Sequence, residues 1–191
     1  NKSESCSIDS ETVVIKTTPK TDFWQRSYYG FRNDNAPALQ FESGINFTFT
    51  VKVNFDYKSL FDQCGIIIYL DSEYENENFS RLGSVVTNLG YSDWATTDID
   101  TISGIWYRLS RRGSDFLVES SFDGVNFKQM RIFHLHKLGE TTEQMGKSNP
   151  PLVPENTVTF GVYACSPTES NFVATFSEME LEPSNWKAHN P

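Results

Sequence analysis

The stretch 84–94 carries the densest set of side chains that could bind a ligand. It has the pattern of a short strand that runs into a turn, after which Tyr91, Asp93 and Trp94 follow in close succession. An amphipathic ring beside a carboxylate and the amide of Asn88 is a common way to contact the hydroxyls and C–H faces of a sugar. The alternative is structural, with Trp94 packed in the core and Asp93 capping a turn. The residues alone leave both interpretations open.

Trp24 and Arg108 are candidates for the same surface. By alternation, Arg108 shares one face of segment 105–112 with Trp106 and Ser110, and it could clamp a carboxylate, stack on a ring or form a structural ion pair. We expect one sheet to present a shallow concave face to which six residues contribute or which they border. The alternative is an aromatic core closed by an Asp–Arg ion pair. The six residues are Trp24, Asn88, Tyr91, Asp93, Trp94 and Arg108.

A second candidate for chemistry is the acidic run Glu178, Glu180 and Glu182, which alternation places on one strand face. Glycosidases need two carboxylates across the scissile bond, about 5–5.5 Å apart for retention and about 6.5–9.5 Å apart for inversion. Here Pro183 follows at once, and solvated carboxylates on an edge strand also prevent aggregation. We therefore expect exposed carboxylates and no catalytic residue, so the protein is predicted not to be an enzyme.

The sequence gives little support for a metal or cofactor site. His134 and His136 would share a strand face, but zinc needs three or four ligands, and the remaining histidine is His189. The chain shows neither a glycine-rich phosphate loop nor a nucleophile elbow. We expect no metal and no cofactor.

These side chains must be positioned by strands. Segment 46–55 alternates five apolar residues with polar ones, which predicts a long strand with Phe49 facing the core and Lys52 facing outward. The continuous apolar run 64–70 predicts a strand covered on both faces. Further strands are predicted at 12–17, 39–42, 83–88, 105–111, 116–121, 129–134, 157–165 and 172–181. Together they indicate one all-β domain over 1–191, a concanavalin A-like jelly-roll β-sandwich of two antiparallel sheets. The long connection 137–154 is a candidate functional flap.

Composition excludes some classes of partner and indicates a cellular compartment. The formal net charge is −9 and the pI is about 4.8, which argues against nucleic acid and anionic membranes. No stretch approaches the ~20 apolar residues of a membrane span. Cys6, Cys64 and Cys165 form no disulfide framework, and the last two lie in strand-like runs as small buried hydrophobes. A reducing, cytoplasmic compartment is expected.

Several stretches of the chain resemble the family of concanavalin-like proteins named for regulation of enolase. They extend from about residue 22 to about 182, and the segments that carry the resemblance are Asp22-Phe23-Trp24, Asp62-Gln63-Cys64-Gly65, Ser84-Val85-Val86-Thr87-Asn88, Tyr91-Ser92-Asp93-Trp94, Trp106-Tyr107-Arg108, Ser121-Phe122-Asp123-Gly124 and Gly161-Val162-Tyr163-Ala164-Cys165-Ser166-Pro167. The chain departs from that family after Asp62-Gln63-Cys64-Gly65. A Trp-Lys strand is usual there, but Leu70-Asp71-Ser72 passes straight to Glu73-Tyr74-Glu75, as if residues were missing.

The resemblance implies a two-sheet jelly roll without an established activity, and a cytoplasmic protein that affects enolase expression in response to carbon source. Similar domains also accompany sugar-degrading enzymes. We therefore expect a non-catalytic regulatory or interaction protein. The alternatives are a carbohydrate-binding module or accessory protein of sugar degradation and, less favoured, a glycosidase. The partner would be a carbohydrate or another protein, and the sequence specifies neither its identity nor an oligomeric state.

Overall fold

The computed structural model describes residues 6–69, 81–140 and 156–187. Twelve strands and one short 3₁₀ helix lie in these ranges. In chain order the elements are β1 (Cys6–Ile8), β2 (Thr12–Lys16), β3 (Ala38–Ser43), β4 (Phe47–Phe55), β5 (Gln63–Tyr69), β6 (Arg81–Asn88), β7 (Tyr91–Asp98), β8 (Gly104–Arg112), β9 (Asp115–Ser121), β10 (Lys128–His134), η1 (His136–Leu138), β11 (Val158–Cys165) and β12 (Val173–Pro183).

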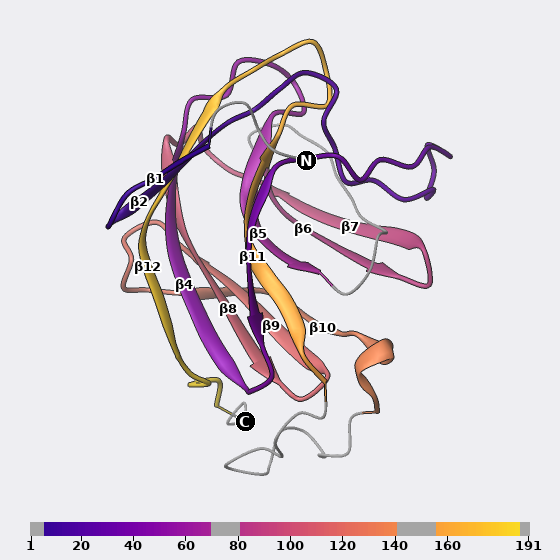
Figure 1. Cartoon of the computed structure of the whole chain (residues 1–191), viewed down its shortest axis with the longest axis vertical. Coiled ribbons are helices and arrows are strands. Elements are labelled where there is room, and N and C mark those ends of the chain that lie inside the picture. Colours follow the sequence, from indigo (N-terminus) through magenta and orange to yellow (C-terminus); the bar gives the residue numbers. More distant parts are fainter. Residues whose placement is uncertain (1–5, 70–80, 141–155, 188–191) are drawn as a thin grey trace.

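The strands form two facing antiparallel sheets and a separate hairpin (Figure 1). The large sheet has the order β1-β2-β12-β4-β8-β9-β10, and the small one has the order β3-β11-β5. Within the described ranges β6 pairs with β7 alone, and this two-stranded unit packs beside β10. The predicted β-sandwich of two antiparallel sheets is confirmed.

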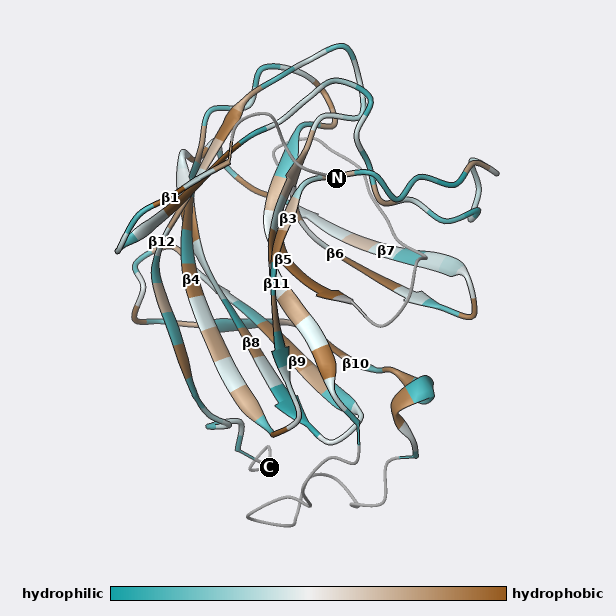
Figure 2. Ribbon diagram, in the orientation of Figure 1, coloured by the Kyte–Doolittle hydropathy of each residue, from teal (hydrophilic) through white to brown (hydrophobic). Residues whose placement is uncertain are grey.

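β4 shows why these segments become strands. Its residues alternate between apolar and polar, so the ribbon is banded along its length in Figure 2. Phe49 and the other odd-numbered residues from 47 to 53 are buried, whereas Lys52 lies on the outer face. The predicted register is confirmed, and only Phe55, at the strand end, is less buried than expected.

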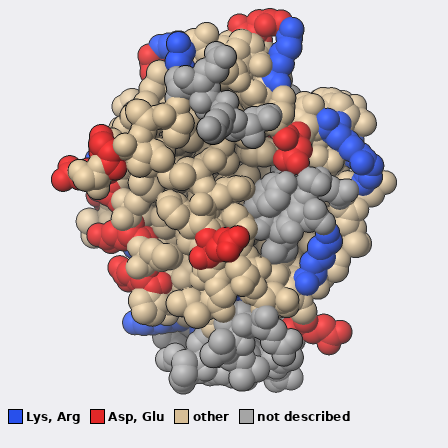
Figure 3. All heavy atoms as spheres, viewed as in Figure 1, with Lys and Arg blue, Asp and Glu red and all other residues tan. Residues whose placement is uncertain are grey.

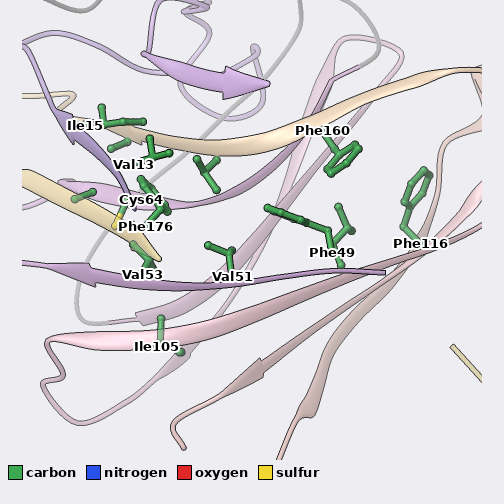
Figure 4. Close-up of a cluster of buried hydrophobic side chains, with 14 of the residues drawn as sticks. Val13, Ile15, Phe49, Val51, Val53, Cys64, Ile105, Phe116, Phe160 and Phe176 are labelled. Carbon is green, nitrogen blue, oxygen red and sulfur yellow. The ribbon is translucent and has the colours of Figure 1, made fainter. Parts of the chain in front are cut away.

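The core lies between the two sheets. Figure 4 shows Phe49 of β4 and Phe160 of β11 pointing toward each other from opposite layers, and their ring centroids are 5.3 Å apart. Phe160 also stacks on Phe47 at 4.3 Å. Burying one such side chain stabilises the fold by about 1.5–3 kcal/mol. Cys64 and Cys165 are buried, as predicted, and Cys6 is exposed. Within the described residues, none of the three forms a disulfide.

One charged side chain is part of the core. Arg111 of β8 is fully buried, and its guanidinium donates hydrogen bonds to three backbone carbonyls. The acceptors are Gly113 O at 2.9 Å, Ser43 O at 3.1 Å and Asn156 O at 2.6 Å. Burial lowers the pKa of Arg111 to about 10, which still leaves it protonated at neutral pH. This arginine ties the large sheet to the end of β3 and to the segment just before β11.

The sequence did not predict β1 or β7. Residues 91–98 are mostly polar and exposed, so no apolar alternation marks β7 as a strand. Pairing with β6 is what makes it extended. Most of the predicted flap at 137–154 and the departure after Leu70 fall outside the described residues. Within the described ranges, no helix is long and apolar enough to cross a membrane.

Candidate functional site

An open hollow of about 340 Å³ lies between the β6–β7 hairpin and β10. The residues of its walls are two with aromatic rings, two with aliphatic side chains, and one each with a carboxylate, an amide, a guanidinium and an imidazole. The lining residues are Val86, Asn88, Tyr91, Asp93, Arg131, Ile132, Phe133 and His134. Three of them, Asn88, Tyr91 and Asp93, are among the six residues expected from the sequence.

The hairpin places these three side chains together by its register. Asn88 is opposite Tyr91, and Val86 is opposite Asp93, so all four lie on one face of the two-stranded sheet. Leu89 and Gly90 form the two-residue turn, with φ of 55° and 77°. Positive φ at both positions is the feature of a type I′ hairpin turn, whose twist matches that of the flanking strands.

Asn88 connects the hairpin to the end of β10. Its Nδ2 donates a hydrogen bond to His134 O at 3.1 Å, and its Oδ1 lies 3.1 Å from Nδ1 of His136. His134 is held in turn by Asp115, with Nδ1 and Oδ1 2.8 Å apart. The expectation that both histidines share a strand face is wrong, because β10 ends at His134 and His136 lies in η1.

Asp93 is paired with Arg131 of β10. The guanidinium contacts the carboxylate, and its Nη1 also donates to the backbone oxygens of Ser84 at 3.1 Å and Asp93 at 3.2 Å. Arg131 is mostly covered, whereas the Asp93 side chain is largely exposed. An exposed ion pair contributes little stability, about 0–1 kcal/mol, so its main effect here is to fix both groups at the hollow.

Tyr91 supplies the aromatic surface of the hollow. The side chain is 59% exposed, although a ring of this size is usually covered. The guanidinium of Arg26 lies 5.3 Å from the ring centroid and donates to Gly90 O at 2.8 Å. A cation placed over the ring and bonded to the adjacent turn holds Tyr91 in position.

The other three expected residues lie elsewhere. Trp24 is only 3% exposed, and its Nε1 donates to Ser27 O at 2.9 Å. It is therefore a buried support for the loop 24–32. Trp94 is opposite Val85, which by alternation places it on the other face of the hairpin from Tyr91. Arg108 lies on the outer face of the large sheet. The expected convergence of all six residues does not occur.

Arg108 belongs to a separate cluster on that outer face. Its guanidinium carbon lies 3.5 Å from the ring centroid of Phe127, and Nη1 lies 3.7 Å from the carboxylate of Glu119. Nε donates to Thr50 Oγ1 at 3.4 Å. The Asp–Arg pair that was considered from the sequence therefore involves Arg131 rather than Arg108.

A third cluster, which sequence reasoning missed, forms around Glu178 of β12. Lys52 Nζ donates to Oε1 at 2.8 Å and Trp106 Nε1 donates to Oε2 at 2.9 Å. The Lys52 ammonium also lies 4.4 Å from the Trp106 ring centroid. These hydrogen bonds hold the pKa of Glu178 below its usual range.

Glu178 reaches these donors because β12 is irregular there. The pairing with β4 shifts between Ser177 and Glu180, and Glu178 has a φ of 51°. A bulge of this kind redirects a side chain, and no composition or spacing signal in the sequence marks it. Glu178, Glu180 and Glu182 are all exposed, as expected.

Among the described residues, no group of three or more His, Cys, Asp and Glu side chains could hold a metal ion. The polar groups at the hollow are hydrogen-bond donors and acceptors.

Comparison with known sequences gives two matches over nearly the whole chain. A family model described as "Protein of unknown function (DUF1349)" matches residues 1–184. The protein "Regulation of enolase protein 1" of Saccharomyces cerevisiae is 29% identical over 189 residues, which are 95% of this chain and 86% of that protein.

Solved structures also match over nearly the whole chain. A crystal structure of a functionally unknown protein from Saccharomyces cerevisiae matches with a TM-score of 0.80 and 28% identity, over 97% of this chain and 95% of that one. A xylan beta-1,4-xylosidase from Bacillus halodurans matches with a TM-score of 0.63 and 10% identity, over 95% of this chain and 35% of that one. The second likeness concerns the sandwich fold alone.

Proposed function

Because this chain belongs to the DUF1349 family, we propose that it is a non-catalytic regulatory protein that binds a small, sugar-like polyhydroxylated ligand in the hollow beside β10. The regulatory part of the proposal is supported by the similar yeast protein, whose name refers to regulation of enolase. The proposed compartment is the cytoplasm, which is supported by three cysteines that form no disulfide within the described residues.

The observation that carries the ligand proposal is the exposed ring of Tyr91 beside fixed polar groups. An aromatic ring offers a flat apolar surface to the C–H face of a sugar, while the groups around it accept or donate hydrogen bonds to hydroxyls. Asp93, Asn88 and His134 are each held by a protein partner. Because these groups are already oriented, a ligand would lose less free energy in ordering them.

Hydrolysis is not part of the proposal. A glycosidase acid must be protonated at working pH, which requires a raised pKa. The pKa of Glu178 is instead lowered by the hydrogen bonds from Lys52 and Trp106, so this carboxylate stays ionised. Its neighbours Glu180 and Glu182 are exposed on the same strand.

Nucleic acid is not a proposed ligand either. The net charge of −9 opposes a polyanion. Figure 3 shows Asp and Glu side chains along the left edge and at the centre of the visible face, with Lys and Arg scattered around its rim. A neutral ligand avoids this electrostatic cost, which favours a sugar over a phosphorylated compound.

Thermal unfolding in the presence of monosaccharides tests the proposal. Glucose, xylose, mannose, galactose and arabinose would each be titrated against the full chain. A ligand that binds only the folded state raises Tm in a concentration-dependent way. We expect at least one sugar to do so and Tyr91→Ala to remove the effect. Calorimetric titration would give the affinity.

The matched control is Phe122→Ala, which removes a ring of similar exposure, 55%, from the turn after β9. This variant should bind as the wild type does. If none of the sugars shifts Tm, or if Tyr91→Ala binds as tightly as the wild type, the hollow is not a sugar site. Retention of the wild-type Tm in the absence of sugar would show that both variants fold.

A further inference from the structure

The loop 24–32 displays an unusual group of exposed aromatic rings. Tyr28 is 96% exposed, Tyr29 is 41% exposed and Phe31 is 40% exposed. The ring centroids of Tyr28 and Tyr29 are 4.9 Å apart, and those of Tyr29 and Phe31 are 5.8 Å apart. Single exposed apolar residues are ordinary, but a contiguous group of large rings indicates a contact surface. We call Tyr28, Tyr29 and Phe31 the aromatic platform.

The backbone of this loop is held in a defined conformation. Arg26 and Tyr28 have φ of 58° and 61°, a region that residues other than glycine rarely adopt. Arg26 N donates to Phe31 O at 2.9 Å, which closes the loop. Trp24 lies beneath the loop, with its ring centroid 5.3 Å from that of Tyr29. The loop that carries the platform is therefore closed by a backbone hydrogen bond and supported by the Trp24 ring.

The platform is attached to the hollow through one arginine. Arg26 donates to Gly90 O in the β6–β7 turn and covers the ring of Tyr91, which lines the hollow. Between the loop and β7, Ser92 N donates to Gln25 O and Gln25 N donates to Ser92 Oγ, both at 3.2 Å. Figure 1 shows this indigo loop projecting from the body of the protein beside the β6–β7 hairpin. Arg26 thus connects the loop that carries the aromatic platform to the turn and the Tyr91 ring at the hollow.

We propose that the ligand is a linear oligosaccharide, with one sugar unit in the hollow and the following units stacked on the aromatic platform. This inference rests on the proposed function. The polar groups of the hollow can orient the hydroxyls of one unit, whereas the platform offers mainly ring surface, which suits the C–H faces of further units. A monosaccharide would leave all three platform rings uncovered.

The test is the dependence of affinity on chain length. Calorimetric titrations of the full chain would use glucose, xylose and mannose, each with its linear 1,4-linked oligomers of two to six units. For the sugar that the hollow accepts, we expect Kd to fall about ten-fold between one unit and four, which corresponds to ~1.4 kcal/mol. The double variant Tyr28→Ala/Tyr29→Ala should keep the monosaccharide affinity and lose this gain.

Two control variants separate the outcomes. Tyr91→Ala should weaken monomer and oligomer alike, and Phe122→Ala should weaken neither. If a monosaccharide binds but affinity does not rise with length, the proposed function stands and the platform inference fails. If the rise persists in the double variant, the platform is not a subsite, and its rings are then better assigned to a protein contact. If no monosaccharide binds, the hollow is not a sugar site and both proposals fail.

Discussion

Lys52 of β4 and Glu178 of β12 are joined by a hydrogen bond of 2.8 Å between Nζ and Oε1, although 126 positions separate them in the chain. The contact exists because β12 has a bulge at this point, and the bulge turns the carboxylate toward Lys52 and Trp106. The result is a carboxylate that carries its charge on the outer face of the large sheet, where it is fixed by two donors.

This pairing predicts a stability contribution that depends on pH. The folded pKa of Glu178 is lowered, so its contribution is present above the unfolded pKa and is lost as pH falls through the folded pKa. The difference in free energy of unfolding between wild type and Glu178→Gln should therefore be larger at pH 7 than at about pH 3. Urea unfolding at both pH values measures it. The control Glu180→Gln should show a much smaller change, and an equal change would contradict the prediction.

Truncation of Phe49 should create a cavity in the core. The ring is buried and contacts Phe160 of the opposite sheet, so Phe49→Ala should lower the free energy of unfolding by about 3–5 kcal/mol. Phe122→Ala, at an exposed turn, should change it by less than about 0.5 kcal/mol. Chemical denaturation of both variants provides the comparison, and equal losses would show that the core is not where the structure places it.

Of the glycines in the small sheet, Gly161 should tolerate an added side chain least. A Cβ at this position would lie 1.9 Å from the backbone oxygen of Leu39, in the strand that pairs with β11. Gly161→Ala should therefore cost at least the ~1–3 kcal/mol of a typical overpacked core, because a backbone atom must move. In Gly44→Ala the nearest atom would be 3.5 Å away, an ordinary contact, so this control should unfold close to the wild type. A wild-type Tm for Gly161→Ala would refute the close approach of β3 and β11.

The cysteines should differ sharply in reactivity. Burial raises the pKa of the Cys64 thiol to about 12, so it remains protonated at neutral pH, and Cys165 is fully buried. A thiol reagent such as DTNB should modify one cysteine quickly in the folded protein and all three in denaturant without reductant. Cys6→Ser should abolish the fast phase. A total of one thiol in denaturant would instead indicate a disulfide.

The sequence was sufficient to predict the sandwich because the large sheet and the small sheet both bury one face. Period-two alternation in β4 identified the strand and its register, and Phe49 and Lys52 lie on the expected sides. The same reasoning failed for β7, whose residues are mostly exposed and carry no apolar pattern. It also gave no sign that Arg111, on the core-facing side of β8, would be buried and satisfied by three carbonyls.

For the candidate site, the sequence determined which residues share a face along each strand, and only the tertiary structure decided which faces meet. Asn88, Tyr91 and Asp93 were grouped because they follow one another closely in the chain. Trp94 was grouped with them for the same reason, although the hairpin places it on the opposite face. Arg108 could not be excluded from that group, nor could Arg131 be identified as the partner of Asp93, because these relations depend on packing between distant segments. Alternation along a strand is a local property of the backbone, whereas the partner of a side chain across the fold is fixed only when the sheets pack together.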